Sequence, residues 1–149
     1  MLYLPDSNIL IYAKMTGMPE HGVAFDWLDA TLNDPNSVLV LCETTILSFC
    51  RITTNAKIFD PPLPFSDVGV FISDLVARSN VQLNRASSDH FTEVADFMKD
   101  PQLGGNLVVD VHLAILAMNS GAVLVSRDKD YLKIPYLKVL NPFEARIDE

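Results

Sequence analysis

The sequence predicts an α/β fold in which a parallel sheet is flanked by helices. Short apolar runs alternate along its 149 residues with longer segments of helical periodicity. The runs VLVL at 38–41 and VLV at 123–125 are apolar at every position, as strands buried on both faces are. There is no internal repeat and no clear linker, so we expect a single domain over residues 1–149.

The first half of the chain predicts two strands and four helices. The strands are expected at 2–5 and 38–41, and the helices at 7–14, 21–33, 43–54 and 66–78. Gly17 and Pro19 end the first helix. The segment FDPPLPF carries three prolines and must be a loop, after which Ser66 can cap the fourth helix.

The second half predicts three strands and two helices. The strands are expected at 81–83, 123–125 and 138–140, and the helices at 89–99 and 107–119. Ser88 and Asn106 are the expected N-caps, and Gly121 is the expected C′ residue of the last helix. The segment DPQLGG and the turn through Pro135 are expected loops.

Composition limits the class of protein. Asp and Glu outnumber Lys and Arg by 19 to 11, which argues against a broad basic surface for duplex nucleic acid but leaves room for a local basic patch. No apolar run reaches the roughly 18 residues of a membrane span, and the start of the chain lacks the pattern of a secretory signal. We therefore expect a soluble cytoplasmic protein, in which Cys42 and Cys50 are core thiols.

Four acids stand out against apolar sequence. Asp6, Glu43 and Asp128 each follow a predicted strand, and Asp110 lies inside the apolar segment NLVVDVHLAILAM. In an open parallel sheet the carboxyl ends of the strands form the ligand-binding edge. Asp110 can join that edge from an early turn of its helix.

Four gathered carboxylates would repel one another unless a cation neutralised them. Mg²⁺ and Mn²⁺ prefer carboxylate and water oxygens, and such ions activate water for attack on phosphodiesters. The pattern therefore predicts a metal-dependent phosphoryl-transfer or nuclease site.

Each acid also has a simpler interpretation. Asp6 could be a helix N-cap, and Glu43 could favour the positive end of its helix. Asp128 and Asp130 could be ordinary loop acids. Asp110 could form a buried salt bridge, which we rank below metal binding because the helix around it is apolar on nearly all sides.

Other chemistry has less support in the sequence. We expect His112 to be a surface or hydrogen-bonded histidine, because it faces away from Asp110 on the predicted helix. His21 and His90 carry no pattern. No GxSxG motif, P-loop or glycine-rich dinucleotide turn is present.

The segments PDSNILIYA, ETTILSFCRI, GNLVVDVHLAILAMNSGAVLVSRDKDYLKIP and LNP together resemble the PIN domain, and more closely the VapC-type ribonuclease toxins of type II toxin–antitoxin pairs. The resemblance covers essentially the whole chain. It implies a three-layer α/β/α sandwich around a parallel sheet and RNA cleavage that depends on Mg²⁺ or Mn²⁺.

The resemblance also implies catalytic roles for the four acids. Asp6 and Asp110 are the positions that hold the metal most directly, and Glu43 is the acid after the second strand. Asp128 is the first acid of the late motif, here SRDKDY, and joins the predicted metal ligands.

Three further positions match supporting roles. Asn8 and Ser126 support the carboxylates through hydrogen bonds, and Asp130 takes part in some relatives. Tyr131 stands where phenylalanine is commoner in the family.

Basic residues cluster near the late acids. The candidates for contact with the RNA backbone are Arg127, Lys129, Lys133 and Lys138, with Arg51 as a further candidate. An equally good interpretation is a solvated loop whose cations balance the neighbouring acids. The expected substrate is structured RNA cut at a loop, and the family suggests tRNA.

The family also implies partners. We expect a homodimer, higher toxin–antitoxin assemblies and a VapB-like antitoxin whose basic residue pairs with the acids and blocks metal binding. Trp27 and Phe25 could line the dimer or antitoxin groove, although core packing is the simpler role for each.

Three other functions compete with a toxin. One is a housekeeping PIN nuclease without an antitoxin, and another is a catalytically inactive PIN scaffold. The third is a receiver-type signalling module, which would carry paired acids after the first strand and a lysine after the last. This chain has only Asp6 at the first position and no matching lysine.

Overall fold

The computed structural model describes residues 1–144 and contains a five-stranded parallel sheet. The strands are β1 (Leu2–Pro5), β2 (Val38–Leu41), β3 (Val81–Leu83), β4 (Ala122–Val125) and β5 (Val139–Leu140). Their order across the sheet is β3-β2-β1-β4-β5, and every neighbouring pair is parallel. The predicted parallel sheet is confirmed, and β1 and β4 lie side by side near its centre.

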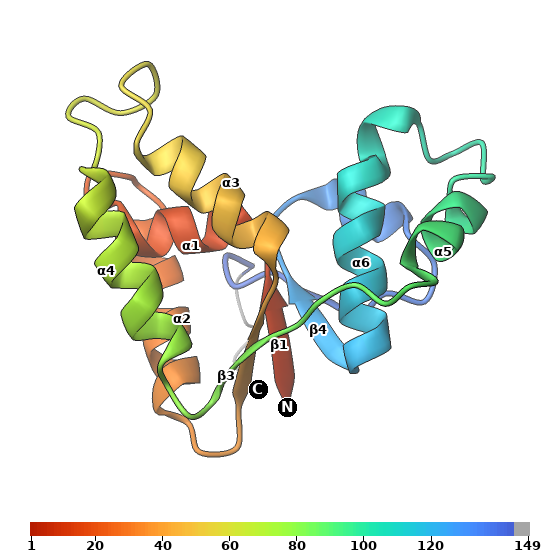
Figure 1. Cartoon of the computed structure of the whole chain (residues 1–149), viewed down its shortest axis with the longest axis horizontal. Helices are drawn as coiled ribbons and strands as arrows, with labels where there is room; N and C mark the ends of the chain where they lie inside the picture. Colours follow the sequence, from red (N-terminus) through yellow and green to blue (C-terminus); the bar gives the residue numbers. More distant parts are fainter. Residues whose placement is uncertain (145–149) are drawn as a thin grey trace.

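Helices cover both faces of this sheet. They are α1 (Ser7–Lys14), α2 (His21–Asn33), α3 (Glu43–Thr53), α4 (Phe65–Val76), α5 (His90–Phe97) and α6 (Val108–Ser120). Helices α1 to α4 lie on one side and α5 and α6 on the other (Figure 1). The predicted three-layer α/β/α sandwich is therefore confirmed.

Each interface between the sheet and its helices has its own core. Phe49 of α3 is fully buried and packs with Leu39 and Leu41 of β2 on the α1–α4 side. On the other side α6 contributes Val111 and Ala114, both fully buried, against the sheet. Because α6 lies between the sheet and α5, its sequence is apolar on nearly all sides.

The predicted helix caps were wrong at three helices. The residues in the N-cap positions of α4, α5 and α6 are Pro64, Asp89 and Leu107, and none makes a side-chain capping hydrogen bond. Ser66 lies inside α4, Ser88 lies before the cap of α5, and Asn106 lies in a 3₁₀ turn at Gly105–Leu107. The physical reason is that Pro64 already holds extended backbone before α4, while 3₁₀ geometry leads directly into α6.

Gly121 ends α6 in the way that the sequence predicts. Its backbone is left-handed, with φ of 70°, and its N–H bonds back to the carbonyls of Ala117 and Met118. This tight ending lets the chain enter β4 at Ala122. In the described part of the chain, no helix has the length and apolar character to span a membrane.

Candidate metal centre

Three of the four predicted acids meet at one edge of the sheet. Asp6, Asp110 and Asp128 line a single small cavity of about 110 Å³. Asp6 directly follows β1, Asp128 lies just beyond β4, and Asp110 lies in the first turn of α6. Because β1 and β4 are parallel neighbours, their carboxyl ends bring the first two acids together.

Asp6 is held rigidly inside the protein. Its side chain is only 6% exposed, it accepts a hydrogen bond from the backbone N–H of Ile9 at 3.1 Å, and the Ser126 hydroxyl donates to its other oxygen. Burial raises the pKa of Asp6 to about 6, with the two hydrogen bonds opposing the rise and the nearby acids adding to it. Asp6 is therefore both the N-cap of α1 and a member of the acidic cavity.

Asp110 is partly buried and lies beside other acids. Burial raises the pKa of its carboxyl above the ordinary value, hydrogen bonding from Tyr131 opposes this, and Asp128 and Asp130 add to the rise. None of the salt bridges among residues 1–144 involves Asp110. The buried salt bridge considered for this residue is thus not found in that part of the chain.

The acids fit a hard divalent cation. One carboxylate oxygen from each of Asp110, Asp128 and Asp130 lies within 4.8 Å of the other two. Asp128 also accepts the backbone N–H of Asp130 at 2.9 Å, which fixes the turn that carries both. A set of carboxylate oxygens on short, fixed segments suits Mg²⁺ or Mn²⁺.

The structure does not bring Glu43 into this cavity. Its side chain is 66% exposed, and its carboxylate pairs with the Arg85 side chain at 3.6 Å beside a different cavity. The residues that face the acids from α3 are Thr44, Thr45 and Ser48. Successive helix residues point about 100° apart. Glu43 and the next residue, Thr44, therefore point in different directions, and of these two only Thr44 lines this cavity. The catalytic role of Glu43 stays a prediction.

Several hydroxyl groups line the cavity that sequence patterns did not single out. Thr44, Thr45, Ser7 and Ser48 join the predicted Asn8 there. Ser7, Thr44 and Thr45 lie near the start of a helix, where short hydroxyl residues are common as caps, so they give little signal of a site. Ser48 lies in the middle of α3, where a single serine has no distinctive pattern.

Tyr131 closes the cavity on the side of the late motif. It is 2% exposed, and burial among acids raises the pKa of its hydroxyl, so that the phenol stays protonated. The one sequence signal for it is that tyrosine replaces the commoner phenylalanine.

His112 is hydrogen-bonded, as the sequence predicts. Its Nε2 lies 2.7 Å from the Thr44 hydroxyl, and its Nδ1 lies 2.6 Å from Nε2 of His90, which is buried. Burial and the neighbouring His90 both lower the pKa of His112. No sequence pattern indicates this connection, because the two histidines come from different helices, α5 and α6.

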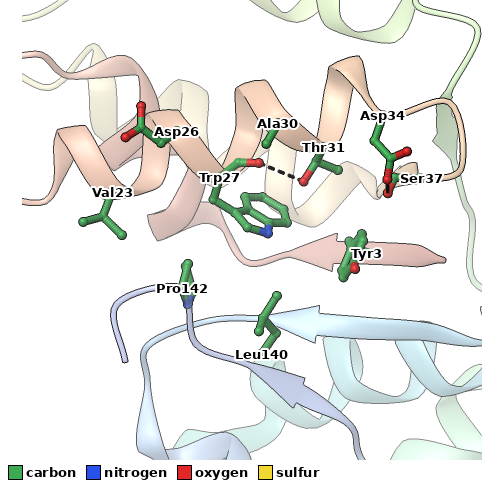
Figure 2. A pocket seen from close by; sticks show the side chains of 10 residues that line it. All are labelled: Tyr3, Val23, Asp26, Trp27, Ala30, Thr31, Asp34, Ser37, Leu140 and Pro142. Atoms are coloured by element: carbon green, nitrogen blue, oxygen red, sulfur yellow. Dashed lines mark hydrogen bonds between the residues drawn. The ribbon is translucent and has the colours of Figure 1, made fainter. Parts of the chain in front are cut away.

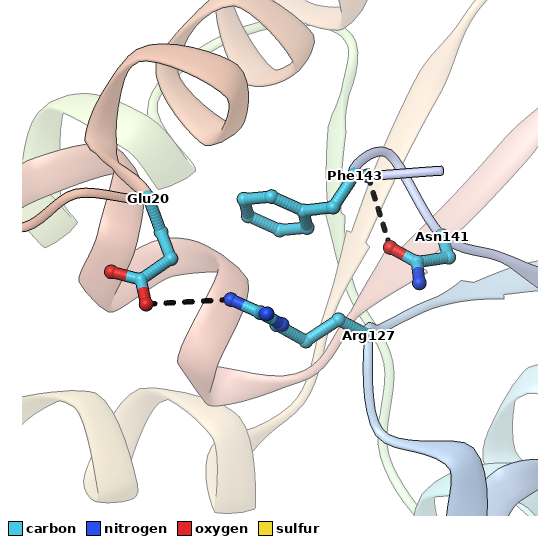
Figure 3. Close-up of polar contacts among 4 residues, drawn as sticks. All are labelled: Glu20, Arg127, Asn141 and Phe143. Atoms are coloured by element: carbon cyan, nitrogen blue, oxygen red, sulfur yellow. Dashed lines mark hydrogen bonds and ion pairs between the residues drawn. The ribbon is translucent and has the colours of Figure 1, made fainter. Parts of the chain in front are cut away.

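The predicted RNA-contacting cations differ in their surroundings. The Arg127 side chain lies 3.3 Å from the carboxylate of Glu20 and its guanidinium lies 4.8 Å from the centre of the Phe143 ring (Figure 3). Lys133 pairs with Asp130 at 3.0 Å. Arg51, Lys129 and Lys138 are exposed. RNA contact by any of these residues stays a prediction.

A larger cavity of about 490 Å³ shares no residue with the metal cavity and lies between α2 and the end of β5 (Figure 2). Trp27 and Tyr3 pack edge to face there, 6.0 Å apart, opposite Leu140 and Pro142. The side chain of Phe25 is 48% exposed on the same helix. Trp27 is partly buried, so it both packs on the sheet and faces a cavity.

Comparison with known proteins agrees with this geometry. The model of the PIN domain family matches residues 3–136. Ribonuclease VapC33 of Mycobacterium tuberculosis is 29% identical over 95% of this chain and 98% of its own length. Ribonuclease VapC37 of the same organism is 32% identical over 85% of this chain and 87% of its own length. The chain therefore belongs to the PIN domain family, in its VapC ribonuclease group.

Solved structures share the fold. The VapBC2 structure from Rickettsia felis, which is bound to promoter DNA, matches with a TM-score of 0.67 at 16% identity over 95% of this chain and 98% of the other. Mycobacterium tuberculosis VapC20, described as a sarcin-ricin loop cleaving toxin, matches with a TM-score of 0.69 at 11% identity over 93% and 99%. These likenesses concern the arrangement of helices and strands.

Proposed function

We propose that this chain is the toxin of a type II toxin–antitoxin pair, and that it acts in the cytoplasm as an endoribonuclease dependent on Mg²⁺ or Mn²⁺. The observation that carries the proposal is the meeting of Asp110, Asp128 and Asp130 within 4.8 Å, beside the buried Asp6. The ribonuclease names of its relatives agree with this.

The residues that line the cavity have different proposed roles. Asp110, Asp128 and Asp130 would hold the ion, and Asp6 adds negative charge from a position fixed by Ser126. When bound, a divalent ion supplies activation of water and stabilises charge on the attacked phosphate. The hydroxyls of α3 that line the cavity can donate hydrogen bonds to phosphate oxygens.

The proposed substrate is structured RNA cut in a single-stranded loop, with tRNA as the expected class. Proteins that read RNA sequence favour loops, because unstacked bases there can be splayed out. The cavity is small and lies at the sheet edge, which suits one phosphodiester on an exposed turn of RNA. VapC20, a structural neighbour, is described as cutting such a loop.

The proposed partners are a VapB-like antitoxin and a second copy of the chain, with larger toxin–antitoxin assemblies as a further step. Asp110 supports this, because no salt bridge among residues 1–144 involves it, and an antitoxin arginine or lysine could pair with it and occupy the place of the ion. The cavity beside Trp27 and the exposed Phe25 offers apolar surface for such a contact. Structural neighbours include toxin–antitoxin complexes such as VapBC-1 from Haemophilus influenzae, with a TM-score of 0.67.

Asparagine substitutions test the proposed activity. We expect Asp6→Asn and Asp110→Asn to fold, to lose metal-dependent RNA cleavage and to stop arresting growth when expressed. Asp74→Asn is a matched control, since Asp74 is an exposed acid on α4 outside the cavity. If either cavity variant cleaves RNA at the wild-type rate and metal dependence, the assignment of the site is wrong.

A further inference from the structure

A second cavity adjoins the metal cavity. It has a volume of about 380 Å³ and lies between the first turn of α3, the segment after β3 and helix α6. Thr44 lines both cavities, so the two share this residue. The other polar residues of the second cavity are Glu43, Asn84, Arg85 and His112.

Hydrogen bonds fix the wall between the two cavities. His112 uses Nε2 for the Thr44 hydroxyl, at 2.7 Å, and Nδ1 for the buried His90, at 2.6 Å. Both ring nitrogens are thus occupied, and the ring can offer the cavity only its face or its carbon edge. An aromatic surface of this kind can stack on a base of single-stranded RNA.

A charged pair stands at the second cavity. The Arg85 and Glu43 side chains are 3.6 Å apart and are 78% and 66% exposed. An exposed pair of this kind contributes little to stability, so a ligand can separate the two charges at small cost. The backbone N–H of Asn84 donates to the carbonyl of Leu41 at 2.8 Å, which ties the segment carrying Arg85 to the end of β2.

We propose that the second cavity binds an unpaired guanine of the RNA, next to the bond that is cut at the metal centre. The proposal rests on the ribonuclease function proposed above. Guanine offers two acceptors, O6 and N7, to a guanidinium such as that of Arg85. Its N1–H and N2–H₂ groups can donate to the carboxylate of Glu43, while His112 stacks on the ring. No other base has two donors for a carboxylate on one edge and two acceptors for a guanidinium on another.

Glu43 then acts in base recognition and not at the metal. The acid after the second strand selects the substrate, while the ion is left to Asp110, Asp128 and Asp130. The two roles make different predictions for Glu43→Gln. Loss of a catalytic acid lowers cleavage of every RNA, whereas loss of a base contact removes the preference for one base.

The experiment uses a hairpin RNA with a fully randomised loop, incubated with the purified full chain and Mn²⁺, and sequencing of the products. We expect the wild type to prefer guanine at one position beside the cut by on the order of tenfold or more. In Arg85→Met and Glu43→Gln, the ratio of cleavage with guanine at that position to cleavage with another base should fall close to one. Arg78→Met is the control for charge, because Arg78 is exposed after α4 and lines neither cavity, and it should keep the preference.

Three outcomes would overturn the proposal. The first is a wild type that cuts the RNA with no base preference beside the cut, or with preference for another base. The second is variants at Arg85 and Glu43 that slow the cutting of all loop sequences equally. The third is a wild type that cuts no RNA in the presence of metal. This third outcome would also contradict the proposed function, whereas the first two would leave it standing. Thermal unfolding of each variant shows that it is folded.

Discussion

Replacing Asp6 by asparagine should stabilise the metal-free protein while it abolishes activity. Burial raises the pKa of the Asp6 carboxyl from 3.8 to about 6, so the native protein holds this proton more tightly than the unfolded chain does. Each pKa unit corresponds to about 1.36 kcal/mol, which makes the difference about 3 kcal/mol. The free energy of unfolding therefore falls as pH rises from about 3.8 to about 6, and the full penalty is present at neutral pH.

Asparagine carries no charge, so the variant escapes this penalty. Its carbonyl oxygen can still accept the N–H of Ile9, while a weakened contact with Ser126 would cost about 1 kcal/mol. We expect the free energy of unfolding of Asp6→Asn to exceed that of the wild type by about 1 to 3 kcal/mol near neutral pH. For a chain of this size each kcal/mol raises the melting temperature by about 2 to 4 °C.

The assay is urea unfolding in EDTA, at neutral pH and at a pH below the ordinary pKa of aspartate. The stability advantage of Asp6→Asn should be present at neutral pH and shrink toward zero in acid, where the wild-type carboxyl is protonated in both states. A variant less stable than the wild type at neutral pH would refute the reasoning. An advantage of the same size at both pH values would do so too, since it could not come from ionisation.

Further predictions concern the surroundings of the site. Arg127→Met and Glu20→Gln should each lower the melting temperature slightly, and the double variant should be no worse than either single one, because the two side chains form one pair; additive losses would contradict this. Lys129→Gln should lower the salt dependence of RNA binding by about one unit of slope, measured by titration at several salt concentrations, and an unchanged slope would remove it from the RNA contact. Phe49→Ala should reduce the free energy of unfolding by about 3 to 5 kcal/mol in urea titrations, because Phe49 is fully buried, and a loss below about 1 kcal/mol would contradict its place in the core.

The strands and the meeting of Asp6 with Asp128 could be predicted because their determinants are local. An apolar run between turn signals gives a buried strand, and parallel strands must end at one edge. Gly121 was predictable for a similar reason. The left-handed backbone at the end of α6 favours glycine through local geometry alone.

The direction of Glu43 could not be predicted, because it depends on the rotation of α3 about its axis. That rotation is set by which side chains of α3 pack on the sheet, with Phe49 fully buried, and not by the strand before it. Two further contacts join residues far apart in the sequence. One is the contact of Arg127 with Glu20, and the other is the set of hydrogen bonds that links Thr44 through His112 to His90. Contacts of this kind produce no periodicity in the sequence, so they could not be predicted from it.

Asp110 at the start of α6, together with Asp128 and Asp130 beyond β4, is proposed to hold the divalent ion that the reaction needs. The most direct measurement is the anomalous scattering of Mn²⁺ in crystals of the wild type and of Asp110→Asn. We expect a peak within coordination distance of Asp110, Asp128 and Asp130 in the wild type, and none in the variant. A peak bound elsewhere, or one that persists unchanged in Asp110→Asn, would contradict it.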